Sequence, residues 1–124
     1  MNLSVLVIEG DLAIAGLFVE VFSQQGWEVC TSNDVPSVNR TLLGDRRFDI
    51  ITVSYRFLTT NGLAITRRIR EMEHRKDTPV LLVTGGPDVT GEALAAGVNE
   101  VLYKPIEPCR LVAAVIRHSS ALIA

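Results

Sequence analysis

The 124-residue sequence is poor in cysteine and contains no long hydrophobic run. Its two cysteines, Cys30 and Cys109, form neither a CxxC pair nor part of a Cys/His cluster, which argues against a zinc site and against a disulfide-rich fold. We expect both to be reduced and to act as small core hydrophobes. The apolar run from Val5 to Ile8 is far shorter than the roughly 20 residues that span a bilayer, and no signal-peptide pattern accompanies it. The sequence therefore predicts a cytoplasmic protein with no membrane segment.

Positive and negative residues are also nearly balanced. Twelve Lys and Arg against 14 Asp and Glu give a formal net charge of −2, so the basic footprint that nucleic-acid binding usually needs is missing. Hydrophobic residues make up 48% of the chain, which suffices for one core, while the length is too short for two domains. We therefore expect residues 1–124 to form a single domain that binds neither nucleic acid nor a membrane.

Short apolar runs alternate with helical patterns along the whole chain. The expected strands are Leu3–Ile8, Trp27–Thr31, Phe48–Val53, Val80–Val83 and Glu100–Tyr103. The second and the last are the least apolar, so we expect them at the edges of the sheet, where alternate side chains meet water. Strands that alternate with helices in this way are typical of a parallel sheet covered on both faces.

Capping residues and helical periodicity indicate five helices. The first begins after Asp11 and ends at Gly26, and its expected apolar stripe consists of Ile14, Leu17, Phe18, Val21 and Phe22. The others are expected at Asp34–Leu43, from Asn61 through Met72, at Val89–Ala96 and from Pro108 to Leu122. The fold class is therefore α/β, with a doubly wound five-stranded parallel sheet.

A basic run accompanies the third predicted helix. Its members are Arg67, Arg68, Arg70, Arg75 and Lys76, and we expect them on an exposed face. The simplest interpretation is a solvated surface, and the alternative is a docking patch for an acidic partner.

The carboxyl ends of the expected strands carry most of the candidate chemistry, as is usual in doubly wound sheets. They deliver Glu9-Gly10-Asp11, Ser54-Tyr55-Arg56, Thr84-Gly85-Gly86 and Lys104-Pro105. An acid, two hydroxyls, glycines and a lysine at one edge suggest a site for an oxyanion or phosphoryl group and its counterions. We expect Glu9 and Lys104 to form an ion pair. A serine hydrolase is disfavoured, because no histidine lies at a strand end and Ser54 lacks a G-x-S-x-G context.

At these residues the sequence resembles the receiver domain of two-component response regulators. The segments that carry the resemblance are VLVIEGDLAIAGL, FDIITVSYRFLTTNGLAITRRIR, TPVLLVTGG and VLYKPIEPCRL, and together they extend over nearly the whole chain. The resemblance implies a flavodoxin-like (βα)5 fold with strand order 2-1-3-4-5. It also implies a role in phosphorelay signalling, no enzymatic activity, and a sensor kinase or a downstream signalling protein as partner. In that strand order Cys30 and Cys109 lie near opposite edges of the sheet, too far apart for a disulfide.

The departures from the family fall in its acidic pocket. Ser54 stands at the position of the phosphoacceptor aspartate, and Gly10 replaces one of two adjacent acids that help to hold Mg²⁺ in the family. Glu9 and Asp11 are the acids that remain. A serine phosphate is a stable monoester, so Ser54 cannot reproduce the short-lived acyl phosphate of the family. We expect no cofactor and no functional metal site at Glu9, Gly10, Ser54 and Arg56, with Mg²⁺ bound only if the degenerate site still supports it.

The other family positions are partly kept. The resemblance assigns Thr84 the family's hydroxyl, Gly85 its small neighbour, and Lys104 the lysine that pairs with the phosphoryl group. Val101 occupies the place of a frequent aromatic switch residue, and Tyr103, two positions on and on the same strand face, could substitute for it in part.

We therefore interpret the sequence as a pseudo-receiver that signals by protein–protein contact, independently of phosphorylation. The family's interaction face corresponds here to Val89–Ala96, Val101–Tyr103 and much of Pro108–His118. One alternative is a working receiver that uses Ser54 or another residue as acceptor. Another is a site for a small anion or nucleotide at Lys104, Gly85 and Gly86. The partner and the oligomeric state do not follow from the sequence.

Overall fold

The computed structural model describes residues 2–119, and its main feature is a five-stranded parallel sheet. The strands are β1 (Ser4–Ile8), β2 (Glu28–Ser32), β3 (Ile50–Ser54), β6 (Val80–Thr84) and β7 (Glu100–Tyr103). Their spatial order is β2-β1-β3-β6-β7, and all neighbouring pairs are parallel. Counted along the chain, this is the predicted order 2-1-3-4-5, and the two weakest apolar runs lie at the edges as expected.

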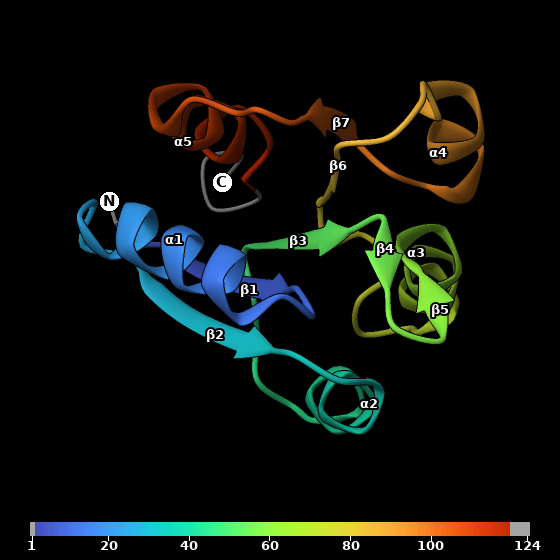
Figure 1. Cartoon of the computed structure of the whole chain (residues 1–124). Helices are drawn as coiled ribbons and strands as arrows, with labels where there is room; N and C mark the ends of the chain where they lie inside the picture. Colours follow the sequence, from blue (N-terminus) through green and yellow to red (C-terminus); the bar gives the residue numbers. More distant parts are fainter. Residues whose placement is uncertain (1, 120–124) are drawn as a thin grey trace.

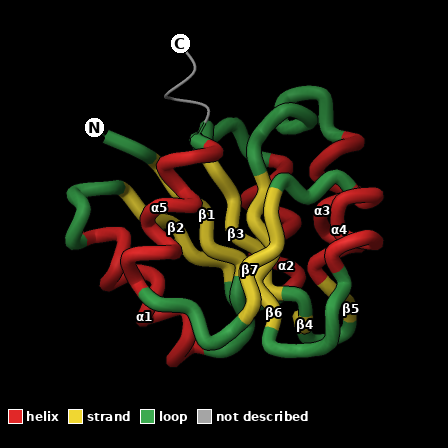
Figure 2. The backbone as a smooth tube through the Cα atoms, turned by 90° about the horizontal axis from the view of Figure 1, so that it is seen from above, coloured by secondary structure: helices red, strands yellow, loops and turns green. Residues whose placement is uncertain are grey.

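Helices cover both faces of this sheet. They are α1 (Leu12–Ser23), α2 (Val35–Leu43), α3 (Gly62–Glu71), α4 (Thr90–Ala96) and α5 (Pro108–His118). Figures 1 and 2 show α1 and α5 on one face, and α2, α3 and α4 on the other. One buried cluster includes Val5, Phe22 and Val115, and a second, under the other helical layer, includes Leu6 and Ile69. The doubly wound α/β fold is thus confirmed.

Three helices begin at side-chain caps. Asp11 accepts hydrogen bonds from the backbone N–H groups of Ala13 and Ile14, at 2.9 and 3.2 Å, and so caps α1. Asp34 caps α2 and Asn61 caps α3 in the same way. These caps satisfy N–H groups that lack partners within the helix, so the first turns begin where the sequence predicts.

Several finer predictions are wrong. Phe22 of the predicted stripe of α1 is buried as expected, but Leu17 is 60% exposed, because Ala15 faces the sheet in its place. Cys30 packs beside the core as expected, whereas Cys109 lies exposed in the first turn of α5. Helix α5 ends at His118, and the predicted end at Leu122 lies outside the described residues.

Within residues 2–119, none of the helices has both the length and the apolar character that crossing a bilayer requires.

A small hairpin between β3 and α3 was not predicted. It pairs β4 (Arg56–Phe57) with β5 (Thr60–Asn61), and Leu58 at its turn has a positive φ of 52°. Helix α3 then starts at Gly62, where an added Cβ would lie 2.6 Å from the carbonyl oxygen of Ser54. Only glycine permits this approach, which brings the start of α3 directly against the end of β3.

Arg67, Arg68 and Lys76 of the basic run are exposed as expected, but Arg70 and Arg75 are not on a solvated face, contrary to the sequence prediction. Arg75 lies in the turn after α3, is 2% exposed, and donates hydrogen bonds to four backbone carbonyls in the segment 41–46. Burial lowers the pKa of Arg75, and the charge of Asp45 opposes this. The guanidinium therefore caps the carbonyls at the C-terminal end of α2. Cζ of Arg75 also lies 5.2 Å from the centroid of the Phe48 ring.

Arg70 makes a second structural connection. Its guanidinium donates hydrogen bonds to the carbonyls of Lys76, Thr78 and Gly97 and to Oδ1 of Asn99. Gly97 has φ 104°, and a Cβ there would lie 2.8 Å from Cγ of Arg70. The end of α4 is therefore held against α3.

Candidate functional site

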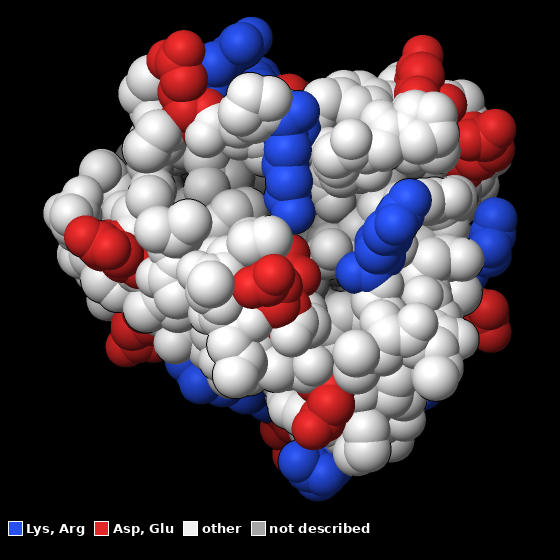
Figure 3. Space-filling view, in the orientation of Figure 1, with Lys and Arg blue, Asp and Glu red and all other residues white. Residues whose placement is uncertain are grey.

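The strand ends converge on one crevice, as the sequence predicts. The crevice has two adjoining hollows, of about 550 and 380 Å³, and both are lined by Ser54, Arg56 and Lys104. The first extends to Glu9, Gly10 and Asp11, and the second to Thr84, Gly85 and Gly86. Figure 3 shows this face as largely uncharged, with two basic side chains beside a hollow and acidic side chains close to one of them.

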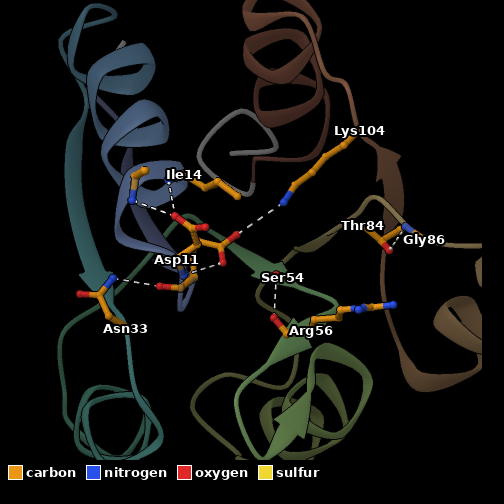
Figure 4. Close-up of polar contacts among 10 residues, drawn as sticks. Asp11, Ile14, Asn33, Ser54, Arg56, Thr84, Gly86 and Lys104 are labelled. Atoms are coloured by element: carbon orange, nitrogen blue, oxygen red, sulfur yellow. Dashed lines mark hydrogen bonds and ion pairs between the residues drawn. The ribbon is translucent and has the colours of Figure 1, made fainter.

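The acidic side of the crevice is organised around Glu9. Its side chain is 7% exposed, accepts a hydrogen bond from the backbone N–H of Asp11 at 3.1 Å, and pairs with Nζ of Lys104 at 3.9 Å. The expected ion pair is confirmed, although 3.9 Å is at the long limit for such a contact. The side chain of Asn33 donates to the carbonyl of Glu9 at 2.9 Å and fixes the loop from the β2 side. Asp11 also lines the outer hollow, but its Oδ1 is engaged as the cap of α1 (Figure 4), so Glu9 is the acid that pairs with Lys104.

Ser54 ends β3 and is buried. Its hydroxyl donates a hydrogen bond to the carbonyl of Arg56 at 2.9 Å (Figure 4). Among residues 2–119, the histidines His74 and His118 bond instead to α2 carbonyls and to Glu100. The hydroxyl thus has no base in contact with it, and the arrangement is not that of an activated nucleophile.

The donors in the crevice do not fit a resident Mg²⁺ ion. Mg²⁺ prefers an octahedron of oxygen ligands, usually one or two carboxylates with waters. Here Glu9 is already bonded to Lys104 and to a backbone N–H, Gly10 has no side chain, and the carbonyl of Arg56 accepts from Ser54. The described part of the chain contains no group of three or more acidic, His or Cys side chains that could hold a metal.

Thr84 and Tyr103 occupy paired positions on β6 and β7 but do not bond to one another. The hydroxyl oxygen of Thr84 accepts from the backbone N–H of Gly86 at 3.1 Å. Val101 packs against the core beneath α4. Tyr103 instead places its hydroxyl at the start of α4, where it donates to Oδ1 of Asp88 at 2.7 Å and accepts from the N–H of Val89 at 3.1 Å.

The contact between Tyr103 and Asp88 predicts an acidic titration. Hydrogen bonds from Tyr103, and secondarily from Thr90, lower the pKa of Asp88 from 3.8 to about 2. The contact is therefore fully formed above pH 3.8 and is lost as the pH falls through about 2. We expect the carboxyl-carbon NMR shift of Asp88 to titrate near 2 in the native protein and closer to 3.8 in Tyr103→Phe. Tyr55→Phe is the control and should leave the midpoint unchanged, whereas a native midpoint near 3.8 would contradict the contact.

The region beside β7 carries a further ionic cluster. Glu100 accepts from Arg117 at 2.8 Å and pairs with Nε2 of His118 at 2.6 Å. Partial burial alone would raise the pKa of Glu100, but its bonds to Arg117 and His118 outweigh this and lower it. The cluster connects the edge strand β7 to the end of α5. A groove of about 350 Å³ lies between these two elements.

Two features of the site were missed by the sequence analysis. The side chain of Arg56 lines both hollows, whereas the sequence analysis considered this residue only as part of the degenerate metal site. Asp88 at the start of α4 was not considered. Its position in the loop after Thr84-Gly85-Gly86 was the available signal, since that loop follows a strand end.

This architecture, with its crevice at the carboxyl ends of a 2-1-3-4-5 sheet, is that of a receiver-type signalling domain. The chain belongs to the response regulator receiver domain family, whose model matches residues 5–116. Domains of this family are in general signalling modules that act with sensor kinases and effector proteins rather than enzymes.

Individual relatives agree with this assignment. The chain is 31% identical over 108 residues to protein PetR of Rhodobacter capsulatus, covering 86% of this chain and 44% of PetR. It is 24% identical over 112 residues to the phosphate regulon regulator PhoB of Pseudomonas aeruginosa, covering 89% of this chain and 48% of PhoB. The chain therefore spans less than half the length of these two relatives.

Solved structures share the fold. The receiver domain of the sensor histidine kinase PA1611 from Pseudomonas aeruginosa superposes with a TM-score of 0.84 at 23% identity, covering 95% of this chain and 98% of that one. That structure holds a magnesium ion in its active site cleft.

Proposed function

We propose that residues 1–124 form one receiver-like signalling domain that acts in the cytoplasm through protein–protein contact, without accepting a phosphoryl group and without catalytic activity. The observation that carries this proposal is the hydrogen bond from the Ser54 hydroxyl to the carbonyl of Arg56. A neutral alcohol, already bonded to backbone, stands at the end of β3 where the family has its acceptor aspartate.

The chemistry of the crevice supports this proposal. Acceptance of a phosphoryl group needs a nucleophile together with cations that neutralise the transferred oxygens. Ser54 lacks an activating base, and the acids that remain to hold Mg²⁺ are Glu9, which pairs with Lys104, and Asp11, which caps α1. A phosphoserine would also hydrolyse too slowly to act as a reversible switch.

The surface that we infer for partner contact comprises α4, β7 and α5. Tyr103 holds the start of α4 to β7 through Asp88 and Val89, and Arg117 connects α5 to Glu100 on β7. These bonds fix the three elements relative to one another without any phosphoryl group. A partner, either a sensor kinase or a downstream signalling protein, would therefore meet a preformed surface.

Phosphodonor treatment tests the proposal. The native chain is incubated with Mg²⁺ and acetyl phosphate, and separately with Mg²⁺ and beryllofluoride, and is then examined by intact mass and amide NMR. We expect no covalent phosphoryl group in the first mixture and no beryllofluoride-dependent shifts at Ser54, Thr84 and Lys104 in the second. A labile phosphoryl group on any residue would contradict the proposal and favour a working receiver with another acceptor.

A further inference from the structure

We propose that copies of this chain associate head to tail, with helix α1 of one copy docked against the groove between α2 and α3 of the next. The contact uses neither the crevice nor the surface formed by α4, β7 and α5. It therefore goes beyond the proposed function and does not rest on it.

Helix α1 has an apolar outward face, whereas a surface helix normally carries charged side chains there. Two of its leucines are largely exposed, Leu12 by 70% and Leu17 by 60%. No other helix or strand within residues 2–119 exposes two large hydrophobic side chains. The other exposed residues of the helix are Ala13, Gly16, Glu20 and Ser23. Clustered exposed apolar side chains usually mark an interaction site, so this face is suited to contact with another protein surface.

Leu17 is the side chain of this face that can act as an anchor. Ala13, one turn before it, and Gly16, its neighbour, are both small, and a Cβ added at position 16 would meet no atom within 4 Å. Glu20 follows Leu17 by one turn and is the only charged side chain of α1. The face therefore presents one projecting aliphatic side chain with a carboxylate beside it and no cation.

A matching pit lies between α2 and α3. Its volume is about 110 Å³, which is of the size that a single aliphatic side chain fills. No carboxylate is among the residues that line it. Its apolar lining consists of Val35, Val38, Phe57, Ala64 and Ile65.

Arg68 supplies the charge at this pit. Its guanidinium is exposed and bonds to the neutral amide oxygen of Asn39 on α2. Within residues 2–119 no carboxylate pairs with it, so it is able to bond to an incoming one. Charge is divided along the sequence in the same way. Residues 40–76 hold nine of the twelve Lys and Arg with four acids, whereas residues 1–39 hold five acids and no Lys or Arg. The α1 face and the pit are therefore complementary in charge as well as in shape.

The two surfaces cannot meet within one molecule. Figures 1 and 2 show α1 on one face of the sheet and α2 and α3 on the other. The contact must therefore join two copies, with Leu17 of one in the pit of the next and Glu20 beside Arg68. Because the two sides of the contact differ, each added copy leaves a free pit at one end and a free α1 face at the other. Association of this kind continues beyond a dimer.

Sedimentation velocity of the full chain tests the inference, at concentrations up to about 1 mM because an interface with one anchored side chain binds weakly. We expect an average mass that rises with concentration and exceeds that of a dimer. Leu17→Gln removes the anchor and Ala64→Gln fills the pit, so each should weaken association at least about tenfold. Leu94→Gln removes a leucine of α4 that is 54% exposed and should leave association unchanged.

Mixing the two impaired variants tests the head-to-tail geometry directly. Leu17→Gln still has an intact pit and Ala64→Gln still has an intact α1 face, so the mixture should form a one-to-one complex and stop at the mass of a dimer. A variant that had lost its fold would not form this complex. Charge exchange gives a second check. Glu20→Arg and Arg68→Glu should each weaken association, and the double variant should recover it.

A chain that stays monomeric at every concentration would overturn the inference. Association of the native chain that stops at a dimer would also overturn it, as would an Ala64→Gln variant that associates like the native chain, since either indicates a symmetric contact. An equal loss in Leu94→Gln would contradict the assignment to α1. None of these outcomes alters the result of phosphodonor treatment, so failure of this inference is distinct from failure of the proposed function.

Discussion

The double substitution Ser54→Asp with Gly10→Asp should create a Mg²⁺ site in the crevice. Both new carboxylates would stand beside Glu9, and a Cβ at position 10 would lie 3.7 Å from its nearest neighbours, the carbonyl of Asn33 and Cγ of Leu58. A Cβ at position 10 would thus make only ordinary van der Waals contacts. If each added carboxylate contributes at least about 1.4 kcal/mol, Mg²⁺ affinity rises by about a hundredfold or more. Isothermal titration calorimetry with MgCl₂ measures this gain.

The control is Ser54→Asn with Gly10→Asn, which matches the carboxylates in size but not in charge. It should show no gain in Mg²⁺ affinity. An unchanged affinity in the carboxylate variant would mean that the ends of β1 and β3 do not converge as described. A gain in both variants would mean that amide oxygens suffice, and that charge is not what the native crevice lacks.

Replacement of Arg75 by alanine should cause a large loss of stability. The substitution leaves four carbonyls of the segment 41–46 without their donor, in a site where the side chain is 2% exposed. Each buried carbonyl left without a donor costs about 1–3 kcal/mol, so the loss is a large part of the 5–15 kcal/mol that stabilises a typical domain. The midpoint of urea unfolding, measured at constant slope, reports this change.

One further variant separates geometry from charge at position 75, and a second, on the exposed surface of α3, is the control. Arg75→Lys keeps the charge but cannot reach four carbonyls with one ammonium, so we expect it to be destabilised nearly as much. Arg67→Ala removes an exposed arginine of α3 and should change the free energy of unfolding by no more than about 0.5 kcal/mol. If Arg75→Ala behaved like Arg67→Ala, the cap on α2 would contribute nothing.

The elements of the sheet could be predicted from the sequence because their signals are local, whereas the strand order followed from the resemblance to the receiver family. Nearly continuous aliphatic runs mark β1, β3 and β6, and polar caps such as Asp11 and Asn61 mark the starts of helices. The strand ends of a parallel sheet meet at one edge whatever their sequence separation. The crevice could therefore be assembled from four short motifs.

The failed predictions depend on contacts that no local pattern reveals. Leu17 was placed in the core because nearly every position of α1 is apolar, so periodicity leaves the rotation of the helix about its axis undetermined. Arg75 was placed in solvent because the carbonyls that it binds lie about thirty positions earlier in the chain. The β4–β5 hairpin turns at Leu58 and Thr59, without the glycine or asparagine that usually announces a turn.

Helix α4 is anchored at both ends by side chains from other elements. Tyr103 holds the residues that precede it, and Arg70 holds the carbonyl of Gly97 that follows it. A displacement of the whole helix would have to break both anchors at once, although its seven residues bury little surface of their own. Such a helix resists gradual adjustment, so a rearrangement of this part of the molecule would release both of its ends together.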